Sequence, residues 1–277
     1  MQKIKSLFGV ILTFTLFISL GTKMSSCTKE VIVRDTVIIK DTITRVDTFP
    51  CTDLKEGLVA WYKFTGGSLK DSSGYNNDIV FSNATPTSDR FGKTNNAYLF
   101  NGGSYMRVNN SASLNPTRIT LVGIVKFNDF YRGAYGQNQI IKKGFRDQND
   151  GIYGLRVGAS DAGGSVDTTK EIGYGYYGNN QFDQISAADR VNYIKTNQWK
   201  IFVFTYNGID AKYYVDGVLR ETKTGVVGFT PNTDGLFIGR AENPSYPFWL
   251  TGVIDEIRIY NRALCDCDIK ELNKLKN

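Results

Sequence analysis

Hydrophobic and polar residues alternate in short segments along most of the chain after residue 57, and turn-forming residues separate the segments. The last of them, Val253–Tyr260, is typical of a strand with one face in a core. Strict alternation places Asp255 on the same face as Ile257 and Ile259, which we expect to be the apolar face. A buried carboxylate needs a cation or several hydrogen bonds. We therefore expect this strand either to complete a metal site or to hold a loop.

Further segments have the same character, and helical periodicity appears only at the end of the chain. There, Asp266–Lys276 places Ile269, Leu272 and Leu275 on one face of a short helix. The pattern predicts an all-β fold, a sandwich of two packed antiparallel sheets with a short C-terminal helix. The other expected strands are Leu58–Phe64, Ala97–Phe100, Tyr105–Val108, Ile119–Phe127, Gln139–Lys143, Tyr153–Val157, Glu171–Tyr177, Lys200–Tyr206, Lys212–Val215 and Leu236–Ile238.

The N-terminal residues have the composition of an export signal. Lys3 and Lys5 precede an apolar run over residues 7–20, which is short for a transmembrane helix. Small residues then lead to Cys27, an arrangement that resembles a bacterial lipobox. We interpret residues 1–26 as a lipoprotein signal peptide and Cys27 as the lipidated residue. An ordinary secretory signal is the alternative.

Residues 27–50 read as a tether between this cysteine and a folded domain. Asp-Thr recurs at Asp35, Asp41 and Asp47, and β-branched residues alternate with charged ones. This composition favours an extended chain, and no second apolar segment is present to cover it. The tether is expected to be an extended spacer, with plain disorder as the alternative.

Charge and composition exclude several classes of function. The formal net charge is +6, but the basic residues are scattered and form no dense patch, which argues against nucleic-acid binding. The chain has no histidine, and this excludes Ser-His-Asp and Cys-His catalysis and His-ligated zinc. Any catalysis would depend on carboxylates, lysine or tyrosine.

Several motifs resemble laminin-G-like domains of the concanavalin A-like lectin/glucanase superfamily. They are Gly57-Leu-Val-Ala-Trp-Tyr-Lys-Phe64, Asp71-Ser-Ser-Gly-Tyr-Asn-Asn-Asp78, Tyr213-Tyr-Val-Asp-Gly217 and Gly252-Val-Ile-Asp-Glu-Ile-Arg-Ile-Tyr-Asn-Arg-Ala-Leu264. The resemblance implies that residues 51–277 form one concanavalin A-like jelly roll. The tether is similar to those of Bacteroidetes-type surface lipoproteins. This implies an exported protein anchored by lipid in the outer membrane or at the cell surface.

Calcium is often structural in the resembled family, and the chain offers candidate ligands for it. The turn over residues 71–78 is rich in oxygen ligands of the kind that calcium prefers. If this turn meets the last strand, Asp71, Asn76 and Asp255 would form one calcium site. The alternative is that Asp255 accepts backbone N–H bonds or pairs with Arg90, without a metal.

Two aromatic stretches have the mixture of rings and amides that lectin sites use, in which rings stack on sugar faces and polar groups bind hydroxyls. The candidate ligand-binding residues are Tyr174, Tyr176, Tyr177, Asn179, Tyr246 and Trp249. For any one of them, packing in the core is the competing interpretation. The Glu-x-Asp-x-x-Glu strand of the superfamily's glucanases is missing, and the adjacent Asp255 and Glu256 point to opposite faces. No enzyme activity is expected.

An exported protein meets an oxidising compartment, and the termini of sandwiches of the resembled fold lie close together. A disulfide from Cys51 to Cys267 is therefore expected, with Cys265 as the alternative partner of Cys51 and a bond between Cys265 and Cys267 as the weaker option. The whole sequence favours a non-catalytic carbohydrate-binding or adhesion module whose partner is a glycan. The alternative is a structural or protein-interaction domain of the cell envelope that contacts a surface or extracellular protein and binds no sugar.

Overall fold

The computed structural model describes residues 53–131, 133, 136–144, 152–158, 172–178, 194–225, 228 and 231–276. For residues 152 and 172–178 only the backbone is described. The expected signal peptide, the lipidated Cys27, the tether and Cys51 lie outside these residues, so the predictions about them stay predictions. Within the described part of the chain, no helix is both long and apolar enough to cross a membrane.

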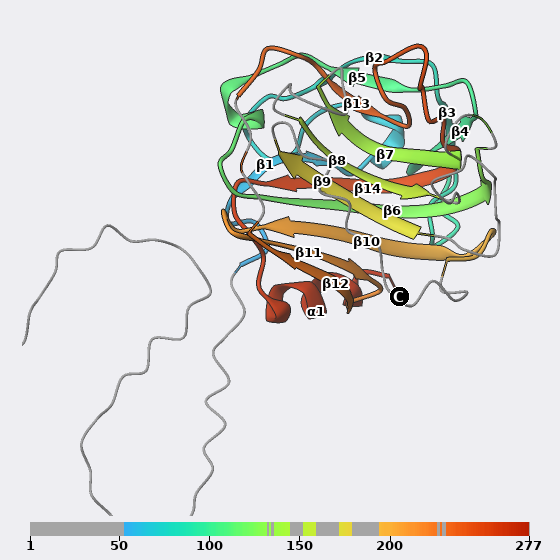
Figure 1. Cartoon of the computed structure of the whole chain (residues 1–277). Helices are drawn as coiled ribbons and strands as arrows, with labels where there is room; N and C mark the ends of the chain where they lie inside the picture. Colours follow the sequence, from blue (N-terminus) through green and yellow to red (C-terminus); the bar gives the residue numbers. More distant parts are fainter. Residues whose placement is uncertain are drawn as a thin grey trace, which may run out of the picture.

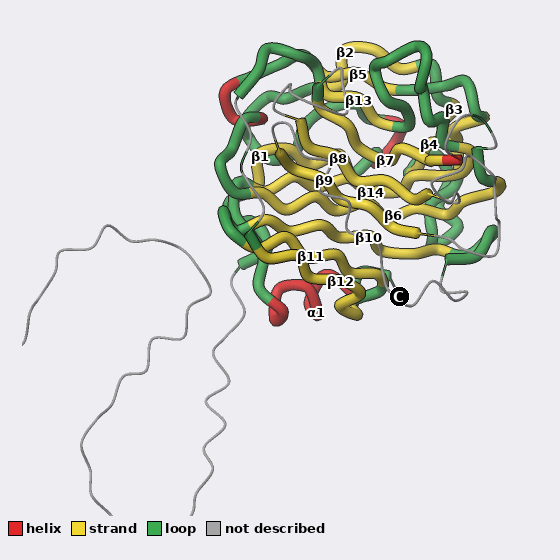
Figure 2. Tube along the Cα trace, in the orientation of Figure 1, coloured by secondary structure: helices red, strands yellow, loops and turns green. Residues whose placement is uncertain are grey.

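Two antiparallel sheets face each other (Figure 1, Figure 2). In the eight-stranded sheet the order is β12-β11-β10-β6-β14-β4-β3, and β1 also pairs with β14. Its strands are β1 (Leu58–Tyr62), β3 (Thr85–Thr87), β4 (Ala97–Asn101), β6 (Ile119–Asp129), β10 (Trp199–Tyr206), β11 (Asp210–Val215), β12 (Val218–Thr224) and β14 (Thr251–Tyr260).

The six-stranded sheet has the order β2-β5-β13-β7-β8-β9. Its strands are β2 (Ile79–Ser82), β5 (Met106–Val108), β7 (Gln137–Lys143), β8 (Ile152–Gly158), β9 (Ile172–Gly178) and β13 (Leu236–Ile238). Two short 3-10 turns, Thr65–Gly67 and Ala112–Leu114, join strands, and one helix, α1 (Asp266–Lys274), closes the chain. The predicted all-β jelly-roll sandwich with a C-terminal helix is confirmed, as is every predicted strand.

The sequence pattern missed three strands, β2, β3 and β12. Each of them stands at the end of its sheet in the strand order, and most of their side chains are at least partly exposed. An edge strand with little burial carries no clear alternation of apolar and polar residues, because neither of its faces must be apolar. The missing pattern therefore has a physical cause.

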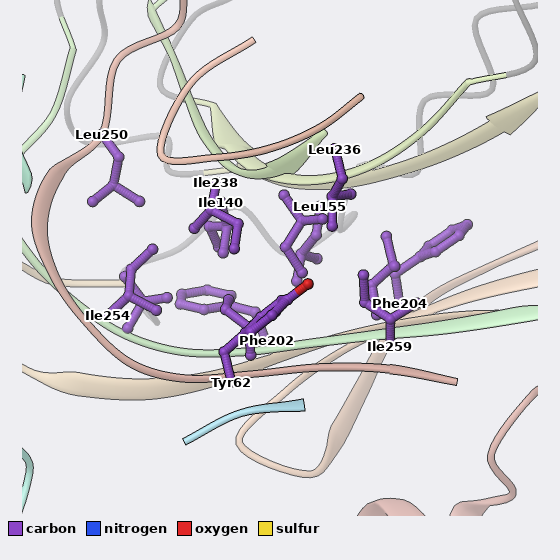
Figure 3. Packing of buried hydrophobic residues seen from close by; sticks show 14 of the residues in the cluster. Tyr62, Ile140, Leu155, Phe202, Phe204, Leu236, Ile238, Leu250, Ile254 and Ile259 are labelled. Carbon is purple, nitrogen blue, oxygen red and sulfur yellow. The ribbon is translucent and has the colours of Figure 1, made fainter. Parts of the chain in front are cut away.

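The main core fills the space between the sheets (Figure 3). Ile254, Ile259, Phe202 and Phe204 reach it from the eight-stranded sheet. The six-stranded sheet contributes residues that include Leu236, Ile238, Ile140 and Leu155. The buried Tyr62 also lies in this core, where its hydroxyl donates to the backbone oxygen of Asn77 at 2.6 Å. The hydroxyl of this buried tyrosine is therefore hydrogen-bonded, as buried phenols require.

A β-bulge corrects the expected register of β14. Ile254 lies opposite Val125 and Glu256 opposite Ile124, so Asp255 is the extra residue of the bulge. The shift brings Ile254 into the main core together with Ile257 and Ile259. The prediction that Asp255 shares the apolar face was therefore wrong, because strict alternation does not continue through a bulge.

Asp255 instead pairs with Arg90 from the turn before β4. The Asp255 carboxylate accepts the backbone N–H of Arg90 at 3.0 Å and Nη1 of its guanidinium at 2.6 Å. Nε of Arg90 donates to the backbone oxygen of Leu275 at 2.7 Å. Next to the bulge, the Glu256 carboxylate accepts Nε1 of Trp61 at 2.5 Å and Nε of Arg258 at 2.6 Å. This network joins β1, β14, the turn and the C-terminal residues.

Helix α1 lies next to β11 and β12 (Figure 1) and packs against the face of the eight-stranded sheet that points away from the main core. Ile269 and Leu272 from the helix pack against buried residues such as Val122 and Val203 in a second apolar cluster. At its N-terminus the Asp268 carboxylate accepts Nη1 of the buried Arg262 at 2.8 Å and completes a capping box with Cys265. The central strands β6, β10 and β14 of the eight-stranded sheet are therefore buried on both faces along most of their length.

The two cysteines at the start of α1 differ in their covalent state. Cys265 is a free cysteine. Cys267 is disulfide-bonded, and its partner lies outside the described residues. The pairing of Cys267 with Cys51 is thus compatible with the fold and stays a prediction.

Breaking the Arg90–Asp255 pair tests its contribution to stability. The two side chains are only 9% and 6% exposed, and removal of one partner leaves a buried charge uncompensated. We expect Arg90→Met to lower the free energy of unfolding by about 3 kcal/mol, measured by urea denaturation.

The matched control is Lys70→Met, because Lys70 pairs with Asp78 at 2.7 Å while its side chain is 78% exposed. This exposed pair is expected to contribute less than about 1 kcal/mol. Equal losses in the two variants would show that burial of the Arg90 pair has no special role.

Candidate functional site

Strand register places aromatic and cationic residues together on the outer face of the six-stranded sheet. In β13, Leu236 and Ile238 point into the main core, so Phe237 between them points away from it. Phe237 lies opposite Arg107 of β5 and Lys142 of β7. Phe81 of β2 lies opposite Arg107 on the other side. The row Phe81–Arg107–Phe237–Lys142 therefore crosses the outer face of this sheet.

The ring of Tyr105 lies close to three other aromatic rings on this face. Its ring centroid lies 4.8 Å from that of Phe81, 6.0 Å from that of Phe237 and 6.3 Å from that of Trp249. The Arg240 guanidinium stacks over Tyr105 and Trp249, at 4.8 Å from each ring centroid. We call these five residues, Phe81, Tyr105, Phe237, Arg240 and Trp249, the Arg240 cluster. Phe81 is 39% exposed and Tyr105, Arg240 and Trp249 are half-buried, so the cluster reaches solvent.

The backbone around Gly239 positions Arg240. Gly239 has a φ of +85°, and a Cβ there would lie 2.4 Å from Cδ1 of Phe100. Only glycine satisfies both conditions at the end of β13. The Arg240 side chain then folds back, so that Nε donates to the backbone oxygen of Ala241 at 2.6 Å and Nη2 to that of Glu242 at 2.8 Å. The guanidinium is thereby held rigidly among the rings.

Glu242 brings a carboxylate to the same place. Burial raises its pKa, the Asp234 carboxylate adds to the increase, and Arg240, Arg107 and Lys142 oppose it. Its Oε2 is buried and has no hydrogen-bond partner within the described part of the chain. A desolvated acceptor of this kind is suited to a hydroxyl donor from a ligand, because burial without a partner is unfavourable.

Of the predicted ligand residues, Tyr174, Tyr176 and Tyr177 lie on β9 of this sheet, and Tyr246 and Trp249 lie in the segment between β13 and β14. Trp249 is a member of the Arg240 cluster, and Tyr246 is exposed, with its ring 6.2 Å from that of Phe248. Tyr174, Tyr176 and Tyr177 belong to β9, where they lie opposite Arg156, Gly154 and Tyr153 of β8. Gly154 lies opposite Lys142, so Tyr176 occupies the row of Phe237. The side chains of β9 are not described and Asn179 lies outside the described residues, so their roles stay predictions.

Sequence reasoning missed four members of the cluster, namely Phe81, Tyr105, Phe237 and Arg240. For Phe237 a local pattern was available, because it alternates with the apolar Leu236 and Ile238 and must face outward. Phe81 is on an unrecognised edge strand. Tyr105 and Arg240 meet only through the fold, since 135 residues separate them in the chain.

Two of the three expected calcium ligands, Asp71 and Asp255, accept hydrogen bonds from protein donors. The Asp71 carboxylate accepts the backbone N–H groups of Trp61 at 2.8 Å and Asn77 at 3.0 Å, and the hydroxyl of Ser73 at 2.7 Å. Asp255 has the Arg90 guanidinium beside it, which is the alternative without a metal.

Asn76 lies in the same turn with a φ of +58°. The described residues hold no group of three or more His, Cys, Asp and Glu side chains that could bind a metal ion. The donor set does not fit one shared calcium ion, because a guanidinium already neutralises Asp255. Calcium binding by the protein stays untested.

Comparisons with known proteins relate the chain to lectin-like folds. Residues 100–270 match the family described as "Concanavalin A-like lectin/glucanases superfamily". No curated protein sequence matches the chain.

Among solved structures, domain 4 of an extracellular arabinanase from Geobacillus stearothermophilus, solved with arabinotriose, is 19% identical with a TM-score of 0.56. The alignment covers 78% of this chain and 98% of that domain. The binding domain of Paraclostridial Mosquitocidal Protein 1 is 16% identical with a TM-score of 0.61, over 80% of this chain and 52% of that one. The botulinum neurotoxin serotype D binding domain is 16% identical with a TM-score of 0.54, and the alignment covers 80% of this chain and 51% of that one. The chain spans about half the length of these toxin domains, and the likeness is one of fold.

The raised pKa of Glu242 predicts how this residue affects the free energy of unfolding at different pH values. A carboxyl whose pKa is raised by folding binds its proton more tightly in the folded state, so the ionised form lowers stability above that pKa. We expect Glu242→Gln to keep or raise the free energy of unfolding at pH 7, and to abolish the gain in stability that the wild type shows as the pH falls through the raised pKa of Glu242. A loss of more than about 1 kcal/mol in urea denaturation at pH 7 would show that the carboxylate is a structural partner.

Proposed function

The chain belongs to the concanavalin A-like lectin/glucanase superfamily, and from this membership we propose that it is a non-catalytic carbohydrate-binding or adhesion module. The observation that carries the proposal is the Arg240 cluster together with Glu242. Rings, a fixed guanidinium and a carboxylate oxygen that has no hydrogen-bond partner among the described residues meet there on one partly exposed face. Carbohydrates present apolar C–H faces and hydroxyl rims, and this combination of groups matches both.

In the proposed complex, the half-buried rings of Trp249 and Tyr105 pack against the face of a sugar ring. Oε2 of Glu242 accepts a hydroxyl proton, and free donors of Arg240 bind hydroxyl or ring oxygens. Because Arg240 is already held by two backbone carbonyls, little side-chain entropy is lost on binding. The surface would extend across the sheet to β9 and the residues after it, namely Tyr174, Tyr176, Tyr177 and Asn179. Tyr246 would lie at the edge of this surface.

The solved structures support a binding role in general terms. One similar domain was solved with arabinotriose and others are toxin binding domains. The absence of catalysis is part of the proposal and rests on the carboxylates of β14. Asp255 is paired with Arg90, and Glu256 is bound to Arg258 and Trp61. Both carboxylates are therefore occupied by protein partners, whereas the acid and the base of a glycosidase must be free to contact the substrate.

We also propose that the domain is exported and held in the outer membrane or at the cell surface by lipid on Cys27, with residues 27–50 as the tether. The apolar run ending at Cys27 supports this proposal. A disulfide between Cys51 and Cys267 would join the end of the tether to helix α1. A glycan held by the domain would then lie close to the membrane.

A protein-interaction domain without a sugar ligand is the second candidate, and a specific observation favours it. Val218 and Leu219 are about half exposed on β12, which ends the order of the eight-stranded sheet. An open strand edge with apolar side chains can pair with a strand of another protein. Charged residues at Val218 and Leu219 would abolish such an interaction and leave sugar binding intact.

A glycan array followed by titration with the best ligand tests the first candidate. We expect Trp249→Ala and Tyr105→Ala each to weaken affinity about fivefold or more, because each loses roughly 1 kcal/mol or more of stacking. Phe91→Ala is the matched control, since Phe91 is 60% exposed and lies on the turn after Arg90. Binding that survives both substitutions, or no binding of any glycan by the folded protein, would contradict the proposal.

The raised pKa of Glu242 predicts the pH dependence of binding. The ionised carboxylate is the stronger acceptor of a hydroxyl, and its proton returns at a higher pH than for an ordinary glutamate. Affinity is therefore expected to fall as the pH decreases through a midpoint above 4.5. In Glu242→Gln, affinity should be lower at pH 7 and should not change over this range. An unchanged pH profile in the variant would remove Glu242 from the site.

A further inference from the structure

A pocket of about 350 Å³ lies at the edge of the eight-stranded sheet where β1 and β6 begin and β14 ends. It is lined by Glu56, Gly57, Tyr75, Arg118, Asn261 and Arg262. We call it the Arg118 pocket. Its volume is in the range of sites that hold small molecules.

The sheet register explains why these residues meet. Leu58 at the start of β1 lies opposite Tyr260 at the end of β14, and Tyr260 lies opposite Thr120 near the start of β6. Gly57, Asn261 and Arg118, which lie just outside these strand ends, therefore line one pocket. Gly57 has a φ of +77°, and a Cβ there would lie 2.9 Å from Oδ1 of Asn261. Glycine at this position avoids a collision with the Asn261 side chain, which also lines the pocket.

The two arginines of the pocket differ in their bonding. Arg262 is buried, with Nη1 on the Asp268 carboxylate at 2.8 Å and Nε on the backbone oxygen of Glu56 at 2.9 Å. Its charge is neutralised. Arg118 is half-buried and makes no hydrogen bond or ion pair with the residues that the structure describes. One guanidinium with its donors unused thus faces the pocket, and Glu56 and Asn261 lie beside it.

We propose that the Arg118 pocket binds a sugar unit that carries a carboxylate, of the hexuronate class. A carboxylate matches the planar fork of Arg118, which forms two parallel hydrogen bonds with such a group. The exposed ring of Tyr75 offers a stacking face for the sugar ring. The Glu56 carboxylate accepts hydrogen bonds from sugar hydroxyls. The Asn261 amide can donate hydrogen bonds to hydroxyls through its NH2 group and accept them through its oxygen.

The charges of Arg118 and Glu56 favour a sugar with one carboxylate over a neutral sugar or a more highly charged one. A neutral sugar would leave Arg118 desolvated without a partner, which is unfavourable. A phosphate monoester carries more negative charge than a carboxylate and would be repelled more strongly by Glu56. A single carboxylate joined to hydroxyls satisfies both the cation and the anion.

This pocket is distinct from the Arg240 cluster. Trp249 precedes the start of β14 and Asn261 follows its end, and this strand has ten residues. At ~3.3 Å per residue the strand between them is about 30 Å long, so Trp249 and Asn261 are separated by at least this distance along it. The inference therefore does not depend on the proposed function of the cluster.

Titration of the purified protein with sodium glucuronate, glucose and sodium acetate, followed by calorimetry or by NMR shifts, tests the proposal. We expect glucuronate to bind at least tenfold more tightly than glucose or acetate. Arg118→Gln should abolish the preference for glucuronate over glucose, and Tyr75→Ala should weaken glucuronate at least fivefold. Both side chains lack partners that the fold needs, and thermal melting confirms that the variants are folded.

Trp249→Ala is the control that separates the two sites, and it should leave glucuronate binding unchanged. Failure of glycan binding at the Arg240 cluster would not alter this result. The proposal is overturned if glucuronate does not bind, if glucose or acetate binds equally well, or if Arg118→Gln binds glucuronate like the wild type. Loss of glucuronate binding in Trp249→Ala would move the ligand to the cluster and overturn it as well.

Discussion

The central strand of the larger sheet, β14, is buried on both faces, and most of the structure follows from how that burial is satisfied. One face packs Ile254, Ile257 and Ile259 into the space between the sheets. The other carries Glu256, Arg258 and Tyr260, all buried. Charges in such a place must be paired, because removing them from water is unfavourable by several kcal/mol for each ion. The bulge at Asp255 allows both demands to be met, since it resets the alternation and turns one carboxylate toward Arg90.

Two carboxylates show how pairing separates structure from function. Asp255 and Glu242 both have a pKa raised by burial. Asp255 accepts two hydrogen bonds from Arg90, and its network connects the termini of the domain. Oε2 of Glu242 is buried without a partner in the described residues, beside Arg240 and its rings. A satisfied buried charge contributes to the fold, whereas an unsatisfied one beside exposed rings is available to a ligand.

The same core also decides which residues form the surface. Because Leu236 and Ile238 must fill the sandwich, Phe237 is forced outward, and the register then aligns it with Phe81, Arg107 and Lys142. The fold alone does not determine what such a surface binds, since one architecture serves many functions. Proposals about ligands therefore rest on the chemistry of the Arg240 cluster and of the Arg118 pocket.

The sequence by itself determined the sandwich, its predicted strands and the C-terminal helix, because apolar side chains repeat with the period of the element that buries them. It also pointed to Trp249 and Tyr246, because clustered aromatic residues between strands are visible without a fold. Only the tertiary structure decided that Asp255 pairs with Arg90, since a bulge adds one residue without any local mark in the sequence. The meeting of Tyr105 with Arg240, and of Arg118 with Gly57 and Asn261, likewise arose from strand pairing between distant segments. Such contacts depend on register, which is fixed by the packing of the whole core and not by any one stretch of chain.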